Sequence, residues 1–288
     1  MEISLFSQSL VNGIVLSLTV ILVALGLTLV FGIMNIVNLA HGELYMLGAY
    51  LLWWFGVENH LTYFPGFLLA VVSIAFFGIV LERAFFKSIR GQVLPGFLVS
   101  IGLILSLQSL AIIIFGEQPK GVPAPEILQG VLRGWGVAIS LERVAVIAIS
   151  LLCLVVMFQF IHRSKIGKAM QAVAQDPDAA ALQGISINKI SSIAMALGGA
   201  LAAVAGCLIG TISPISSTMG APQLLEALVV ITLGGIGSIP GTIVGGLIIG
   251  LTRGFVSTYA NNTYASITVY LLLFTLLIFR PSGLFSRD

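Results

Sequence analysis

The sequence has little charge. Only 8% of its 288 residues are Asp, Glu, Lys or Arg, against about 25% in an ordinary soluble domain, whereas 58% are hydrophobic. A net charge of +2 from scattered basic residues is too small for a nucleic-acid surface, so we expect no nucleic-acid partner. The composition indicates a protein whose main solvent is the lipid bilayer.

Sites for metals, disulfides and nucleotides are also lacking. The two cysteines, Cys153 and Cys207, lie in apolar runs without a metal-ligand partner, so packed, reduced thiols are expected. A Gly-x-x-x-x-Gly-Lys-Ser/Thr phosphate loop is missing, because the pair Gly167 and Lys168 lacks the upstream glycine and the following hydroxyl. We expect a chain that is not an enzyme, holds no metal or cofactor, and does not bind ATP in this way.

Long hydrophobic runs are what the sequence has. A hydrocarbon core about 30 Å thick requires about 20 apolar residues per helix. The predicted fold class is all-α: a polytopic transmembrane helix bundle with about 8–9 spans in a single domain, residues 1–288. The first run is too long for one span and should turn near Asn35 and Asn38. The expected spans are 10–34, 37–57, 62–81, 93–115, 141–161, 190–212, 224–236, a limb ending near 259, and 264–279.

One pair of these segments is irregular. The segment 224–236 is too short to cross a bilayer alone, and it runs into the glycines Gly234, Gly235 and Gly237. We therefore expect a broken or re-entrant pair near residues 224–259, which is tolerated where protein surrounds it. A second glycine-interrupted segment lies at 32–42, and paired breaks of this kind occur at transport sites in repeat-built transporters. The sequence has no strong repeat, and chance explains the pair almost as well.

Small residues also recur every four positions on two predicted helices, which predicts smooth faces for close helix packing. They are Gly198, Ala202, Gly206 and Gly210 on one helix, and Gly246, Gly250 and Gly254 on another.

Orientation follows from the basic residues, because cytoplasmic loops carry the excess of Lys and Arg. Most of them fit on one side of the membrane, which places the C-terminus in the cytoplasm and the N-terminus and the loop 116–140 outside. These residues are Arg83, Lys87, Arg90, Arg163, Lys165, Lys168, Lys189, Arg280 and Arg287.

The cytoplasmic loop 163–189 is predicted to contain a short helix. Asp176 suits its N-cap, Pro177 its first position, Asp178 the positive end of its dipole, and Gly184 a left-handed C-terminal position. At about two turns such a helix is not stable alone in water, so another surface should pack on it. That surface is either its own bundle or a groove in a partner protein.

Ionisable residues inside the membrane are costly and are candidates for function. Glu226 begins the broken segment near the predicted outer mouth, where its carboxylate could meet an ammonium group; alternatively, it stabilises its helix dipole. His41 and Glu43, after Asn38, are expected to cap the second helix and to pair with each other. Arg253 is expected to extend toward the membrane surface.

At these residues the sequence resembles the membrane permeases of branched-chain amino-acid ABC importers, specifically the smaller of their two permease types. Three blocks and the final RPSGLF carry the resemblance. The first block is ALGLTLVFGIMNIVNLAHGELYMLGAY, in which the matching residues are Asn38, Ala40, His41, Gly42 and Glu43. The second is RSKIGKAMQAVAQDPDAAALQGI, with Gly167, Ala172, Asp176, Ala180 and Gly184, and the third is LGGIGSIPGTIVGGLIIG, from Leu233 to Gly250.

The resemblance implies a bacterial plasma-membrane importer. Its parts are this permease, a related second permease, two cytoplasmic ATPase subunits and an extracytoplasmic substrate-binding protein. The resemblance also implies that the loop 163–189 is the coupling loop and that its short helix docks on an ATPase subunit. The expected ATPase-coupling residues are Gly167, Ala172, Asp176, Pro177, Asp178, Ala180, Leu182 and Gly184. The expected substrate-pathway residues are Asn38, His41, Glu43, Glu226, Gly234, Gly235 and Gly237, of which Glu226 does not come from the resemblance.

Three other functions compete with a branched-chain amino-acid permease. The first is a permease of the same family for urea or short amides. The second is a proton-coupled secondary amino-acid carrier that uses Glu226, Glu43 or His41 as a relay. The third is an intramembrane hydrolase with Ser238 as nucleophile, which lacks the strand-to-helix context of such a turn. The capped cytoplasmic helix favours the ABC permease.

Overall fold

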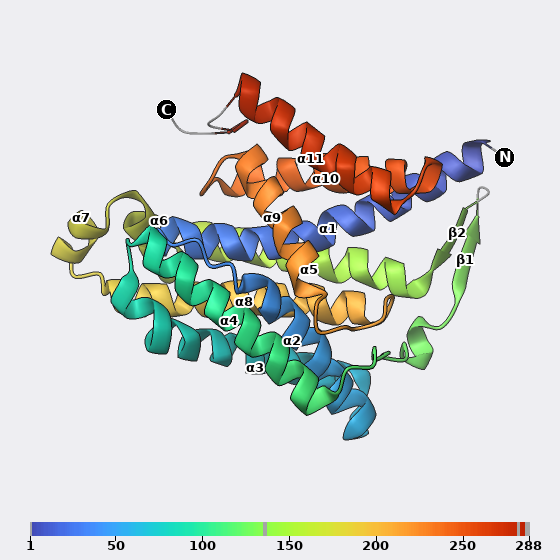
Figure 1. The fold of residues 1–288 in the computed structure, drawn as a ribbon, viewed down its shortest axis with the longest axis horizontal. Helices are drawn as coiled ribbons and strands as arrows, with labels where there is room; N and C mark the ends of the chain where they lie inside the picture. Colours follow the sequence, from blue (N-terminus) through green and yellow to red (C-terminus); the bar gives the residue numbers. More distant parts are fainter. Residues whose placement is uncertain (1, 135–136, 281–282, 286–288) are drawn as a thin grey trace.

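The computed structural model describes residues 2–134, 137–280 and 283–285. They form a bundle of helices with one short hairpin (Figure 1). The helices are α1 (Glu2–Met34), α2 (His41–Trp53), α3 (Tyr63–Leu81), α4 (Val93–Phe115), α5 (Leu141–Arg163), α6 (Lys165–Gln175), α7 (Pro177–Leu182), α8 (Ile187–Gly210), α9 (Gly220–Gly234), α10 (Ile239–Tyr259) and α11 (Asn262–Phe279).

Seven of these helices are long and apolar enough to cross a membrane: α1, α3, α4, α5, α8, α10 and α11. Helix α2 is shorter, although a π-helical turn, Trp54–Glu58, extends it. Helix α9 has only 15 residues. The helical bundle that we expected from the sequence is therefore confirmed as a fold class, and its two irregular members are α2 and α9.

The hairpin is a small departure from the all-α expectation. Strands β1 (Val131–Gly134) and β2 (Val137–Ser140) pair antiparallel, with Val131 opposite Ser140 and Leu132 opposite Ile139. They lie within the stretch 116–140, which we expected to be an irregular loop. The β-branched residues Val131, Val137 and Ile139, with glycines beside them, were the local signal for a hairpin.

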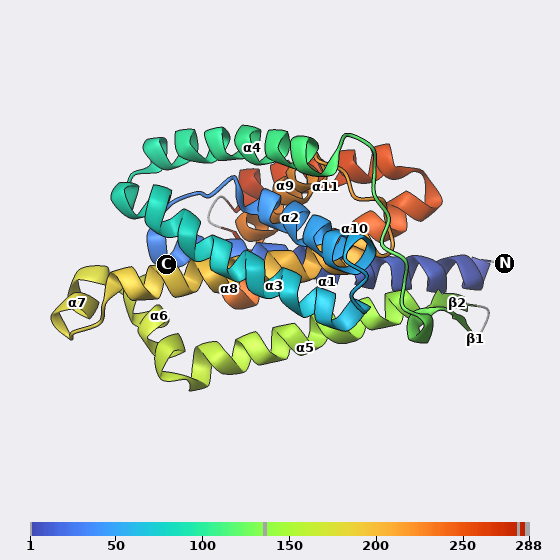
Figure 2. The same cartoon turned by 90° about the horizontal axis from the view of Figure 1, so that it is seen from below.

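The two ends of the bundle differ (Figures 1 and 2). The start of α1 and the β1–β2 hairpin lie at one end. Helices α6 and α7, the α3–α4 connection and the end of α11 lie at the opposite end. The basic connections therefore gather at one end of the bundle, as the distribution of Lys and Arg predicted.

Close packing of small residues holds the bundle's centre together, as the four-residue spacing predicted. A methyl group added at Gly198 of α8 would lie 2.8 Å from the carbonyl oxygen of Gly26 on α1. Gly250 of α10 lies directly against Ser17 of α1, and the hydroxyls of Thr28 and Thr242 join the same two helices at 2.8 Å. Bulkier side chains at these glycines would push the helices apart.

The outer helices expose apolar side chains. Ile113 on α4 is 78% exposed, Leu152 on α5 is 62% exposed and Phe279 on α11 is 79% exposed. A far larger share of α1 and of α8 is buried than of these outer helices, so α1 and α8 form the core. An exposed apolar shell around a buried core is what a membrane helix bundle requires.

Candidate functional site

The helical chain breaks between the end of α1 and the start of α2. Asn35 takes a left-handed conformation with φ of 50°, and the residues up to Ala40 are not helical. Helix α4 supports this segment, because the Ser100 hydroxyl donates to the Val37 carbonyl at 3.4 Å. The predicted turn near Asn35 is confirmed: Asn35 itself is exposed, whereas Ile36, Asn38 and Ala40 are buried against the bundle.

Asn38 organises the start of α2. Its side-chain oxygen accepts a hydrogen bond from the Ala40 backbone N–H at 3.0 Å, and its side-chain nitrogen lies 3.7 Å from the sulfur of Met195 on α8. The side chain is 1% exposed. The expectation that His41 and Glu43 cap this helix was wrong, because the local hydrogen bond comes from Asn38.

His41 occupies a niche between α1 and α8. It is fully buried, and its Nε2 atom would lie 2.8 Å from a methyl group added at Gly26. Within the described residues, neither ring nitrogen has a hydrogen-bond partner. The expected pairing of His41 with Glu43 is therefore wrong, because the two side chains leave α2 in different directions.

Glu43 faces α4 instead. Its Oε1 atom accepts a hydrogen bond from the Gln108 side-chain nitrogen at 2.9 Å, which joins α2 to α4. The residue is 1% exposed, and its Oε2 atom has no hydrogen-bond partner among the described residues. A buried carboxylate with one unsatisfied oxygen is costly, so this position is a candidate for function.

The first turns of α2 and α9 meet in the bundle. A methyl group added at Gly220 would lie 2.5 Å from the carbonyl oxygen of Gly42, so only glycines allow this approach. The N-cap residues Ala40 and Met219 make no side-chain capping bond in the described chain. Two positive helix ends therefore converge. We did not predict this contact from the sequence, because the two glycines are far apart along the chain.

Glu226 forms an ion pair with Arg253 and so joins α9 to α10. The side chains are 12% and 26% exposed, respectively. The expectation that Arg253 extends toward the membrane surface stays a prediction, and the Glu226 carboxylate holds its guanidinium group. In the described part of the chain, no three His, Cys, Asp or Glu side chains gather as metal ligands.

The glycines of the expected pathway form the turn between α9 and α10. Gly235 and Gly237 have positive φ angles of 101° and 82°, while Gly234 packs on Gly241. Residues near the end of the chain close this turn, because the Leu284 N–H donates to the Leu233 carbonyl at 2.9 Å. At 1.5 Å per residue, the turn lies about 20 Å along α9 from Gly220. The expected pathway residues are thus divided between two depths of the bundle.

Helix α7 has the capping that we predicted. The Asp176 carboxylate accepts hydrogen bonds from the Asp178 and Ala179 N–H groups at 3.0 and 2.9 Å, and Pro177 is the first helical residue. Gly184 has φ of 80°, and its N–H donates to the Ala181 carbonyl while Ile185 donates to Ala180. This is a Schellman C-terminus.

The surface of α7 points away from the bundle. Leu182 is 88% exposed, whereas Ala180 is 5% exposed and faces inward. Gly167 and Ala172 lie on α6, where Gly167 packs on the end of α5. We did not predict α6, although its Ser164 cap and the spacing of Ile166, Ala169, Met170 and Val173 are typical of an amphipathic helix.

A buried polar cluster joins the α3–α4 connection to α8. Glu82 is fully buried and pairs with Arg90, and the Ser192 hydroxyl donates to the other carboxylate oxygen at 2.6 Å. Arg90 also donates to the Asn188 side-chain oxygen at 2.7 Å. Because Asn188 and Ser192 lie in the first turns of α8, just after α7, this cluster links the exposed helix to the core. From the sequence we predicted only a cytoplasmic charge at Arg90 and no role for Glu82.

Comparison with known proteins places this architecture in a family. The family described as "Branched-chain amino acid transport system / permease component" matches residues 9–279. The high-affinity branched-chain amino acid transport system permease protein BraD of Pseudomonas aeruginosa is 32% identical over 99% of this chain and 97% of its own length. LivH of Escherichia coli K12 is 30% identical over 98% and 96%, respectively.

A probable permease of the same name, LivH, from Methanocaldococcus jannaschii is 27% identical over 96% of this chain and 91% of its own length. No solved structure matches significantly. Since the family match covers nearly the whole helical bundle, the chain belongs to the branched-chain amino acid transport system permease family.

Proposed function

We propose that this chain is the membrane-spanning permease subunit of an ATP-binding-cassette importer, and that it moves leucine, isoleucine, valine or related small amino acids inward. Family membership and the transport system named for BraD and LivH support this substrate class. The observation that carries the coupling part is α7, which is capped at both ends and exposes Leu182 beyond the bundle.

The complex that we propose has several subunits. A second homologous permease subunit completes the pathway, and an extracytoplasmic substrate-binding protein delivers the amino acid. Two cytoplasmic ATPase subunits hydrolyse ATP, and one of them receives α7. The chain itself forms one permease domain, residues 1–288, with the coupling loop 163–189 inside it.

The membrane and the orientation are also part of the proposal. The chain sits in the bacterial plasma membrane with its C-terminus in the cytoplasm, because the basic connections share one end of the bundle. Helices α2 and α9, together with the non-helical segments before them, add to the seven long helices and bring the number of crossings to eight or nine. The α9–α10 pair is the broken pair of the bundle.

The proposed substrate pathway passes the converging starts of α2 and α9. Amino acids are zwitterions, so a pathway for them needs partners for both charges. The helix ends at Gly42 and Gly220 favour a carboxylate, and the unsatisfied Glu43 oxygen favours an ammonium group. Asn38 and His41 lie at the start of α2, Glu226 lies further along α9, and in this proposal Gly234, Gly235 and Gly237 allow α9 and α10 to move.

Cross-linking tests the coupling proposal directly. In a chain with Leu182→Cys, a bifunctional thiol reagent should join α7 to an ATPase subunit in the native membrane. Leu132→Cys is a matched control, because Leu132 is also exposed but lies in the hairpin at the opposite end. A cross-link at the control position alone would show that the hairpin end of the bundle faces the cytoplasm, opposite to the proposed orientation. Purification of the chain without any ATPase subunit would refute the coupling role.

Uptake assays distinguish the alternatives. In reconstituted vesicles supplied with ATP and binding protein, leucine uptake should continue when the proton gradient is collapsed. Uptake that stops would indicate a proton-coupled carrier. Competition by urea or short amides, with no competition by leucine, would assign the permease to those substrates.

A further inference from the structure

A groove separates α5 from α10 on the outer surface of the bundle. The groove is open to the outside and has a volume of about 370 Å³, within the size range of small-molecule sites. Its lining residues are Leu154, Val155, Phe158, Gln159, His162 and Arg163 of α5, and Ile243 of α10.

The residues that line the groove change from apolar to polar along α5. Leu154, Val155 and Phe158 make the wall apolar nearer the middle of the bundle, and Gln159, His162 and Arg163 follow in the last turns of the helix. The His162 ring lies 4.2 Å from the Phe158 ring, at the boundary between the two parts. A ligand that fits this wall has a long apolar part and a polar end.

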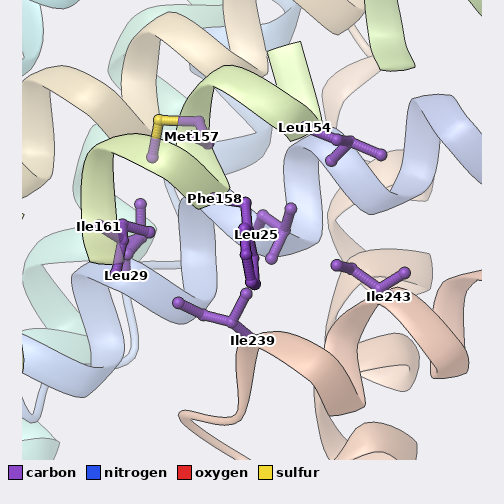
Figure 3. A pocket seen from close by; sticks show the side chains of 8 residues that line it. All are labelled: Leu25, Leu29, Leu154, Met157, Phe158, Ile161, Ile239 and Ile243. Atoms are coloured by element: carbon purple, nitrogen blue, oxygen red, sulfur yellow. The ribbon is translucent and has the colours of Figure 1, made fainter. Parts of the chain in front are cut away.

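The floor of the groove is also apolar (Figure 3). A small recess of about 10 Å³ adjoins the larger cavity and shares Leu154, Phe158 and Ile243 with it. Leu25 and Leu29 of α1 close the recess from below, and Phe158 projects between α1 and α10 in the close view. Such a surface offers no polar partner to water, but it does accept hydrocarbon.

The polar end of the groove is positively charged. Arg163 is exposed and makes no ion pair within the described residues, and Lys165 and Lys168 follow on α6. No Asp or Glu occurs between Glu142 and Asp176 in the sequence. Unpaired cations beside an apolar groove at one membrane surface complement an anionic headgroup.

We infer that this groove is a binding site for an anionic phospholipid. One acyl chain lies along Leu154, Val155, Phe158 and Ile243, and the phosphate-bearing headgroup lies at Arg163 and His162. The lipid comes from the cytoplasmic leaflet if the chain has the orientation proposed above, and this part of the inference rests on that proposal. The occupant would brace α5, the helix that leads into α6 and α7, against α10.

Native mass spectrometry of the chain, with whatever subunits co-purify, tests this inference. The probes are phosphatidylglycerol and phosphatidylcholine with identical acyl chains, added after delipidation. We expect preferential retention of phosphatidylglycerol. In Arg163→Gln the preference should fall roughly five-fold, the effect of one cation near a membrane surface. In Val155→Trp, which fills the apolar part, retention of both lipids should fall.

Two control variants match these changes. Arg83→Gln removes an exposed cation from the α3–α4 connection at the same end, and Val72→Trp enlarges an exposed valine on α3 outside the groove. Neither should alter retention. Equal retention of the two lipids, or an unchanged preference in Arg163→Gln, would overturn the site. A cross-link from Val155→Cys to a second permease in the native membrane would also overturn it, because protein would then fill the groove.

Failure of the proposed transport function is separable from failure of this site. Lipid retention requires neither ATP nor substrate. An absence of leucine uptake with preferential phosphatidylglycerol binding would therefore refute the importer and leave the lipid site in place.

Discussion

The Ser192 hydroxyl on α8 donates a hydrogen bond of 2.6 Å to the Glu82 carboxylate at the end of α3. Glu82 begins a π-helical turn, Glu82–Phe86, a feature often found at functional positions. Through Arg90, the same carboxylate connects to Asn188 in the first turn of α8, which follows the exposed α7. The first turns of α8, which follow α7, are therefore tied to the end of α3 through a charged contact.

Glu82→Gln should destabilise the chain by about 3 to 5 kcal/mol, because it leaves the partly buried Arg90 guanidinium without its counter-charge. Ser192→Ala should cost less, about 1 to 3 kcal/mol, since one carboxylate oxygen loses its donor. Thermal unfolding in detergent measures both. The exposed carboxylate of Glu58 supplies the control, Glu58→Gln, which should be neutral. Similar unfolding temperatures for all three variants would contradict a structural role for the cluster.

Gly184→Val should separate ATP hydrolysis from uptake. A β-branched residue at φ of 80° costs about 1 to 3 kcal/mol, so the Schellman end of α7 should open while the membrane bundle stays folded. The number of amino acids transported per ATP hydrolysed should fall. Gly121→Val is the control, because Gly121 lies in an open loop outside α7 without positive φ. An unchanged transport ratio in Gly184→Val would show that the cap is not needed for coupling.

Gly42→Ala should disrupt the meeting point of α2 and α9. The added methyl group has no room beside the Gly220 carbonyl and the Leu224 side chain, so the helices must separate. Overpacking of this kind costs about 1 to 3 kcal/mol and should reduce transport as well as unfolding temperature. Gly102→Ala on α4, where the added methyl group meets open space, is the matched control. Equal behaviour of the two variants would mean that the contact is looser than the structure indicates.

The Glu226–Arg253 pair can be separated from a substrate role by a double-mutant cycle. Glu226→Gln and Arg253→Gln should each lower the unfolding temperature, because each leaves a partly buried charge unpaired. The double variant should recover most of the loss. Uptake kinetics add the second readout: if Glu226 also meets the substrate ammonium group, KM should rise in Glu226→Gln and in the double variant. A rise only in Arg253→Gln would exclude that contact.

Local patterns predicted the helices well. The bounds 93–115 proposed for the fourth span agree with α4, and the residues Asp176 to Gly184 carry both caps of α7. Such features depend on near neighbours in sequence, so they can be inferred from the residues themselves. The short helix α6 had an equally local signal in its apolar spacing, and its omission was an error of interpretation.

Contacts between distant segments were harder to predict. Gly42 meets Gly220, Glu82 meets Ser192, and Glu226 meets Arg253. A single sequence shows that each of these residues is a glycine or a polar residue within an apolar segment. Which residue it contacts depends on how the helices pack in the tertiary structure. The ATPase-coupling and pathway assignments of individual residues remain predictions, because they depend on contacts with other chains and with substrate.

The end of α9 has a consequence for biosynthesis. Its last carbonyls, from Leu233 and Gly234, accept hydrogen bonds from Leu284 and Phe285, and Gly283 packs on Gly235. These donors follow α10 and α11 in the sequence, so they are synthesised after both helices. The turn between α9 and α10 therefore gains its last hydrogen bonds only after α10 and α11 have been made.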